Sequence, residues 1–333
     1  MSYKPAATTI RGIPLLSMLF TVLLLSGCLI DVALPVYRIG VVLPIEGRYR
    51  EIGYDVFFAS QAAAIVTAED SSMDGYRVEP VIYDDFGDPS RAAAQAEALS
   101  ADPDVLIVVG HWRITTTEAA IPVYQQAEIP LLTTSGDIAL PPNTANIFIL
   151  DAPPEVKQQA LTDYLAAQGI APSAVYIAPP GEDITEAARE INAINARVAI
   201  GPASWGLRQF HALTHGQPGE VLFLTNAIWP GDLREADSFR ATLLTAVPDA
   251  SEPGPYSALA FEAFTLAIDA IRQAHAAGPL TRQRVANALR TGEFNGLTAP
   301  ITFDETGFRR RAPLYLYRWE DTADAPMLME RLQ

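Results

Sequence analysis

Residues 105–118 read VLIVVGHWRITTTE and combine a strand signal, a turn and a helix start. The apolar, β-branched run at 105–110 is typical of a strand that is covered on both faces of a parallel sheet. Thr115 and Glu118 have the spacing of a capping box, which predicts a helix from there to about residue 127. A strand that leads through a short turn into a helix indicates the α/β class, in which ligands bind at the carboxyl ends of strands.

The same alternation of strand and helix signals extends over most of the chain. It predicts two Rossmann-like lobes with parallel sheets, because each parallel strand needs a crossover helix before the next. The predicted strands are residues 37–44, 76–85, 105–110, 129–133, 147–150, 174–178, 198–200 and 221–224. The predicted helices are residues 52–66, one opening at Asp88-Pro89, 115–127, 157–168, 184–192, 232–246 and 256–277.

Composition excludes several classes of protein. The chain has 333 residues, 23 Lys and Arg against 39 Asp and Glu, and a net charge of −16. Such an acidic chain repels phosphate backbones, so we expect no nucleic-acid partner. A single cysteine excludes an internal disulfide and a structural zinc site built on cysteines. The length favours two lobes over one core.

Motifs for catalysis and cofactors are absent. The chain has no glycine-rich dinucleotide or phosphate loop, no nucleophile elbow and no zinc-protease helix. His211 and His215 are four residues apart, but no third metal ligand accompanies them. We therefore expect neither a metal nor a cofactor.

The amino terminus has the pattern of a targeting segment. Lys4 and Arg11 precede an apolar run at 12–25, which is shorter than the ~20 residues that cross a bilayer. The run closes with Leu-Ser-Gly before Cys28, a sequence that resembles a bacterial lipobox. We expect a lipoprotein signal peptide at 1–27, a lipidated Cys28 and a tether at 28–36, so that lipid holds the protein on an extracytoplasmic membrane surface (periplasm or cell surface). The alternative is an ordinary signal peptide beside a chance cysteine.

Several segments resemble one family when they are taken in order. They are YRIGVVLP at 37–44, YDDFGDP at 83–89, Gly110-His111 before the threonines, IPLL at 129–132, YSALAFEA at 256–263, and Gly296-Leu297 with ITFDETG at 301–307. The chain resembles the leucine/isoleucine/valine-binding type of periplasmic binding protein, the branched-chain amino acid or amide class of ABC-transporter substrate-binding proteins. The resemblance implies two lobes joined by three crossover strands, with a solute in the cleft between them. Lobe I is expected at 37–149 plus 250–298, and lobe II, trimmed between 200 and 221, at 150–249 plus 299–333.

The resemblance implies a first-lobe site at the turn after residue 110. In the family this turn holds a ligand carboxylate through backbone N–H groups and a Ser or Thr hydroxyl, so Thr115 and Thr116 are candidates. Arg113 adds a charged donor and Trp112 an apolar wall. The alternatives are a plain N-cap for Thr115, a solvent-facing Arg113 and core packing for Trp112. The usual Ser of this turn falls on Ile114.

The ammonium of the ligand is expected at the segment 134–137. The resemblance implies a carbonyl and a hydroxyl there, and this chain carries Thr134, Ser135 and Asp137. The second lobe departs further, since PPGED at 179–183 replaces the usual Tyr. The candidates for the opposite wall lie at predicted strand ends, where structural roles are the alternative; they are Glu182, Asp183, Asn226 and Trp229.

These features predict a solute receptor. The expected function is capture of a small amino acid or amide-like ligand between the lobes, followed by delivery to an ABC permease. The main alternative is a sensor or accessory lipoprotein with a degenerate cleft. An enzyme would use Asp137 and Glu182 as a carboxylate pair, and we predict that the protein is not one.

Overall fold

The computed structural model describes residues 34–68, 75–138, 140, 144–194, 197–216, 219–320 and 323–333. The predicted signal peptide and Cys28 lie outside these residues. Residues 36–333 form one compact unit, and its first strand begins at Val36, inside the predicted tether. No helix among the described residues has both the length and the hydropathy that crossing a bilayer requires.

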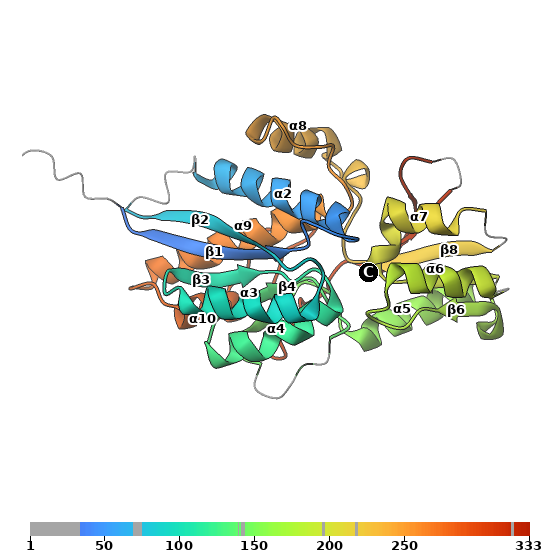
Figure 1. Cartoon of the computed structure of the whole chain (residues 1–333), viewed down its shortest axis with the longest axis horizontal. Helices are drawn as coiled ribbons and strands as arrows, with labels where there is room; N and C mark the ends of the chain where they lie inside the picture. Colours follow the sequence, from blue (N-terminus) through green and yellow to red (C-terminus); the bar gives the residue numbers. More distant parts are fainter. Residues whose placement is uncertain are drawn as a thin grey trace, which may run out of the picture. The chain divides into compact units, whose positions relative to one another are not determined.

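The first sheet has five parallel strands in the order β2-β1-β3-β4-β5 (Figure 1). The strands are β1 (Val36–Leu43), β2 (Arg77–Asp84), β3 (Val105–Val109), β4 (Leu131–Thr133) and β5 (Ile147–Ile149). The helices associated with this sheet are α2 (Arg50–Ala68), α3 (Pro89–Ala101), α4 (Ile114–Gln126), α9 (Ser257–Ala276) and α10 (Arg282–Thr291).

Both faces of this sheet are covered, as its continuous apolar strands predict. Ile39 and Val41 of β1 pack in the same cluster as α2 and α9, whereas Val42 packs in the cluster that contains α3 and α4. Successive side chains of a strand point to opposite faces, so the two helix pairs cover the two faces. Figure 1 shows α2 on one side of β1, and α3 and α4 on the other.

The second sheet has the order β10-β9-β8-β7-β6. Strands β6, β7 and β8 are parallel, and β9 and β10 add an antiparallel edge. The strands are β6 (Val175–Ile177), β7 (Val198–Gly201), β8 (Glu220–Thr225), β9 (Tyr315–Arg318) and β10 (Met327–Arg331). Its helices are α5 (Pro154–Ala167) on one face, and α6 (Ile184–Ala193) and α7 (Arg208–Thr214) on the other.

The chain crosses between the two sheets three times: after β5, after β8 and before β9. The first and third crossings lie side by side, because Ile149 N donates to Gly307 O at 2.8 Å and Arg309 N donates to Ile149 O at 2.8 Å. Helix α8 (Ala236–Ala246) comes after β8 of the second sheet in the chain, yet it packs beside α2 of the first (Figure 1). The predicted lobe boundaries stay a prediction.

The structure differs from the predicted elements in three places and confirms one predicted helix cap. Helix α10 and strands β9 and β10 were not predicted, although Thr281 caps α10 by accepting from Arg284 N at 3.2 Å. The capping box at Thr115 is wrong, since Arg113 is the N-cap of α4 and makes no side-chain capping bond. The predicted N-cap at Asp88 is confirmed, with Arg91 N donating to its carboxylate at 3.0 Å. The segment 200–221 still holds a helix, α7, which has only seven residues.

Candidate functional site

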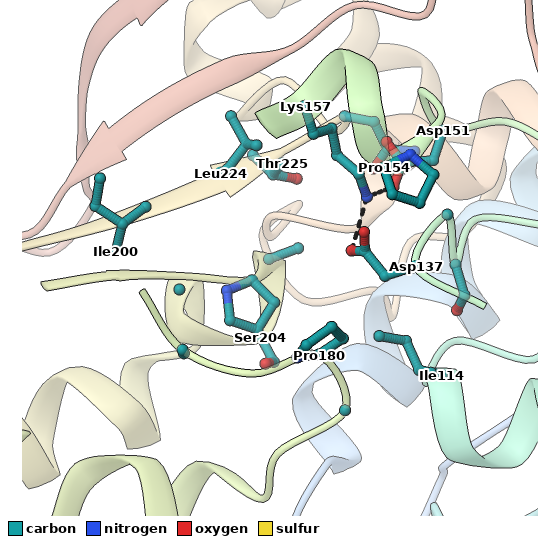
Figure 2. Close-up of a pocket in the computed structure, with 18 of the residues that line it drawn as sticks. Ile114, Asp137, Asp151, Pro154, Lys157, Pro180, Ile200, Ser204, Leu224 and Thr225 are labelled. Atoms are coloured by element: carbon teal, nitrogen blue, oxygen red, sulfur yellow. Dashed lines mark hydrogen bonds and ion pairs between the residues drawn. The ribbon is translucent and has the colours of Figure 1, made fainter. Parts of the chain in front are cut away.

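A cavity of about 420 Å³ lies between the two sheets. Each of the parallel strands β3 to β8 is followed by a segment that lines this cavity. This position is expected for a ligand site, because ligands of α/β proteins bind at the carboxyl ends of parallel strands. Most of its wall is apolar, and Figure 2 shows Ile114 and Pro180 near one end, with Ile200 and Leu224 along the second sheet. The volume and apolar lining suit a small organic molecule.

Arg113 lines the cavity and is held by contacts with the first lobe. Its Nη1 donates to the carbonyl oxygen of Gly87 at 2.7 Å, and its guanidinium carbon lies 3.9 Å from the centre of the Tyr49 ring. The stacking and the hydrogen bond fix the side chain in a half-buried position. A positioned guanidinium at a cavity wall is a strong donor for a carboxylate.

Trp112 serves as both wall and core. Its side chain lines the cavity, is buried and packs edge-on against Tyr256, with ring centres 6.2 Å apart. The indole Nε1 is buried without a hydrogen-bond partner among the described residues. An unpaired buried donor is costly, so this N–H is a candidate for binding a ligand oxygen.

Neither candidate threonine lines the cavity. The hydroxyl of Thr116 is turned back and donates to Arg113 O at 3.0 Å. The Thr115 methyl group faces Gly181 of the second lobe, and its buried hydroxyl has no partner among the described residues. The helix places both residues at the turn, but neither side chain is part of the cavity wall.

Ser135 and Asp137 both line the cavity, but Asp137 is already paired. Lys157 of α5 donates from Nζ to Asp137 Oδ2 at 2.7 Å and to Asp151 Oδ2 at 2.8 Å (Figure 2). Burial lowers the pKa of Lys157, but the two carboxylates outweigh it and raise that pKa above its ordinary value. Burial raises the pKa of Asp151, and this effect exceeds the lowering of that pKa by Lys157. The predicted ammonium partner is thus occupied by an ammonium of the protein itself.

Lys157 was not among the residues predicted from the sequence. It is the only basic residue of α5 and is buried, with Asp151 close to it in the chain. A lone lysine at a predicted helix start, six residues after an aspartate, is a weak signal by itself. The 20-residue separation from Asp137 could not be read as a contact before the crossing after β5 was known.

The second-lobe candidates divide into two pairs. Glu182 and Asn226 line the cavity, and Asn226 Nδ2 donates to Leu150 O at 3.3 Å. Oε2 of Glu182 is buried without a partner among the described residues. Burial, followed by the nearby acidic side chains, raises the pKa of Glu182. Trp229 does not line the cavity; it packs edge-on against Trp319.

Asp183 lies outside the cavity lining and joins the lobes. It caps α6 by accepting from Thr185 N at 2.9 Å, accepts from Tyr49 Oη at 3.0 Å, and forms an ion pair with Arg48. Although burial raises its pKa, the hydrogen bonds, first that from Arg48, lower it to about 2. Nearby, Glu51 of α2 accepts from Arg208 N at the start of α7.

The carboxylates of the described residues are not arranged as a metal site. No group of three or more His, Cys, Asp or Glu side chains suited to a metal occurs in the part of the chain that the structure describes. Asp137 accepts a hydrogen bond from Lys157, so it is not an unpaired carboxylate of the kind that the enzyme alternative requires.

Comparisons with known proteins agree with this architecture. The chain matches the periplasmic binding protein family over residues 36–179 and 165–324. No curated protein sequence matches it. A possible leucine/isoleucine/valine-binding protein from Rhodopirellula baltica superimposes with a TM-score of 0.75 at 16% identity, covering 91% of this chain and 98% of that one.

Two ligand complexes are also similar in structure. The branched-chain amino acid transporter substrate-binding protein of Streptococcus pneumoniae, in complex with isoleucine, has a TM-score of 0.68 at 15% identity and covers 89% of this chain and 99% of its own. A solute-binding protein of an R. palustris ABC transporter, in complex with benzoate, has a TM-score of 0.68 at 12% identity, covering 89% and 96%. These are solute-binding proteins and not enzymes. The chain has the type I periplasmic binding protein fold and belongs to the periplasmic binding protein family.

Proposed function

We propose that the protein is an extracytoplasmic lipoprotein that captures a small amino acid, amide or organic acid between its lobes and delivers it to an ABC importer. The observation that carries this proposal is the cavity, which strand ends of both sheets line. The similar structures include complexes with isoleucine, leucine and benzoate, so the proposed solutes span amino acids and aromatic acids.

Contacts outside the cavity support closure of the two lobes about the solute. Tyr49, which stacks on Arg113 in the first lobe, also bonds Asp183 and receives a hydrogen bond from Ile184 N at 3.3 Å in the second. A ligand that touches both lobes favours the closed arrangement only to the extent that it binds this arrangement more tightly. A permease that recognises the closed form would then select the loaded protein.

The lobes are proposed as 37–149 plus 250–298 and 150–249 plus 299–333. Helix α8 is the exception, because it packs against α2 and, through Phe239, against Phe261 of α9. We assign α8 to the first lobe, so the second crossing of the hinge would precede it.

The test of solute capture is thermal unfolding of the full chain against amino acids, amides and organic acids. A ligand at about 100 times its Kd should stabilise the folded protein by about 2.7 kcal/mol. A shift with one chemical class supports capture. No shift across the panel, with protein free of co-purified solute, contradicts it and favours the sensor alternative.

The test of the anchor is the Cys28→Ser variant in a bacterial host. Wild-type protein should fractionate with membranes and incorporate labelled fatty acid, whereas the variant should do neither. Membrane association of the unlabelled variant would contradict lipid anchoring at Cys28.

A further inference from the structure

The cavity follows helix α5 for most of the length of this helix. Residues three and four apart share one face of a helix, and the α5 residues that line the cavity have this spacing. They are Pro154, Lys157, Gln158, Leu161, Thr162 and Leu165. A helix rises 1.5 Å per residue, so this face is about 16 Å long. The cavity is therefore elongated along α5 and extends from the first crossing into the second lobe.

The second sheet forms the wall that faces α5. Ile177 of β6 and Ile200 of β7 are partners in the strand register, so their side chains lie next to each other on one face of the sheet. Leu224 of β8 points to the same face, because it comes two residues after Leu222, the partner of Ile200. We call this part of the cavity the α5 arm; its lining consists of Leu161, Thr162, Leu165, Ile177, Ile200 and Leu224. Figure 2 shows Ile200 and Leu224 on one side of the view and Asp137 with Ile114 on the other.

The charged groups of the cavity lie outside the α5 arm. Arg113 and Asp137 belong to turns of the first lobe, and Lys157 of the first turn of α5 bonds both Asp137 and Asp151. Glu182 lies in the loop after β6, which faces α4 of the first lobe. The six residues that line the arm are uncharged, and five of them are aliphatic. Polar groups of a ligand are therefore favoured at the first-lobe end of the cavity and apolar groups in the arm.

The arm contains apolar surface that the described part of the chain leaves uncovered. Ile177 is 57% exposed, the largest fraction among the exposed large apolar side chains of the described residues. It lies on β6, the edge strand of the second sheet, whereas α5 packs over Ile200 and Leu222 of the inner strands. Helix α8, which comes after β8, packs beside α2 of the first sheet instead. Exposed apolar surface that continues a cavity is typical of a ligand-binding groove.

The length of the arm exceeds what a branched-chain amino acid can fill. From Lys157 to Leu165 the axis of α5 rises about 12 Å. The side chain of a leucine ligand extends less than about 5 Å from its Cα, through three bonds of about 1.5 Å each. With its polar groups at the first-lobe end, such a ligand would leave most of the arm empty.

We propose that the ligand carries an unbranched apolar tail, longer than the side chain of leucine, which lies in the α5 arm while its polar head lies at the first-lobe end. The inference rests on the proposed function and narrows its solute class by the length of the tail. It applies to an amino acid head and to an organic acid head alike, because the arm contacts the tail alone. Each CH₂ group that the arm buries should tighten binding about fourfold.

The experiment measures Kd by calorimetry on the full chain for two series of ligands, below their aggregation concentrations. One series runs from 2-aminopentanoate to 2-aminodecanoate, and the other from pentanoate to decanoate. In at least one series Kd should fall about fourfold per added CH₂ up to the eight-carbon member. A Kd that stays constant or rises beyond five carbons in both series, or binding of other panel solutes alone, would overturn the inference while leaving solute capture intact. Binding of no member of either series and of no panel solute would overturn both.

Variants of exposed residues assign the tail to the arm. Ile177→Asp places a charge in the arm and should weaken binding of the eight-carbon member about tenfold or more. Thr162→Trp fills the arm without adding a charge and should do the same, so the result does not depend on one variant folding. Leu213→Asp is the matched control, because Leu213 is a 38% exposed residue of α7 in the same lobe that does not line the cavity; it should keep the length dependence of wild type. An unchanged length dependence in the folded Ile177 and Thr162 variants would overturn the placement of the tail.

Discussion

Replacing Asp55 by Asn should change how the stability of the protein depends on pH. Asp55 lies on α2, is 6% exposed, and accepts hydrogen bonds from Gly254 N at 3.1 Å and Tyr256 N at 3.0 Å. These bonds tie the segment that carries Tyr256, a cavity residue, to the first lobe. Burial first, and then the neighbouring Glu51, raise the pKa of Asp55 from 3.8 to about 7.

The sign and the size follow from the two pKa values. The folded state keeps a proton that the unfolded state releases, so the contribution of Asp55 is full below pH 3.8 and is lost as the pH rises to about 7. With about 1.36 kcal/mol per pKa unit, the wild-type protein loses about 2.5 kcal/mol between about pH 5 and about pH 8 through this group. Asp55→Asn removes that loss, but its amide places a donor beside two N–H groups, at a cost of about 1–3 kcal/mol at every pH.

The assay is urea unfolding of both proteins at several pH values. The stability advantage of wild type should be largest near about pH 5 and should shrink by about 2.5 kcal/mol by about pH 8. Glu252→Gln is the matched control, since it removes an exposed carboxyl of the same connecting segment. The hydrogen bond from Arg240 lowers the pKa of Glu252, so this variant should stay parallel to wild type over the range. A constant difference between wild type and Asp55→Asn would refute the reasoning.

Two further substitutions test contacts that join distant segments. Tyr49→Phe removes the hydroxyl that lies between Asp183 and Ile184 N, and it should weaken ligand binding about five- to tenfold. Calorimetry measures the change in Kd. An unchanged Kd would show that this contact does not stabilise the bound state. The pKa of Asp183 is lowered to about 2 in the folded state. The stability that Asp183 contributes should therefore be full above pH 3.8 and be lost as the pH falls through about 2. Urea unfolding at a series of low pH values checks this dependence. Arg309→Met leaves the carboxylate of Glu262 buried without its 2.8 Å partner and should lower the free energy of unfolding in urea by about 3–5 kcal/mol. The double variant Arg309→Met/Glu262→Gln should recover most of that free energy. A loss below about 1 kcal/mol in the single variant would contradict this expectation.

The elements that could be predicted are those with a local cause. The apolar β-branched run at 105–109 forms a fully buried strand, and Asp88 caps α3 as its position before Pro89 predicts. Helix α10 was missed although Thr281 and the spacing of Val285 and Leu289 mark it, because its other residues are mostly polar. These signals are short-ranged: side-chain alternation and capping need only a few neighbouring residues.

The predicted site residues separate according to side-chain direction. Six of the ten candidates line the cavity: Trp112, Arg113, Ser135, Asp137, Glu182 and Asn226. The other four lie at the expected turns but are not part of the cavity wall: Thr115, Thr116, Asp183 and Trp229. A strand end in the sequence predicts where the backbone is, whereas packing decides which way each side chain turns. Whether the six bind a ligand stays a prediction.

The amino-acid sequence by itself determined the α/β class, the alternation that builds both sheets, and the turn that carries Trp112 and Arg113, because hydrophobic periodicity and helix starts are properties of neighbouring residues. Only the tertiary structure decided the partners. Lys157 reaches Asp137 across 20 residues, and Tyr49 reaches Asp183 across 134. Such pairs form only once the segments that cross between the sheets bring distant residues together. The charge at the cavity wall depends on these pairs. The chemistry of the cavity is therefore a property of the packed chain and not of any one segment.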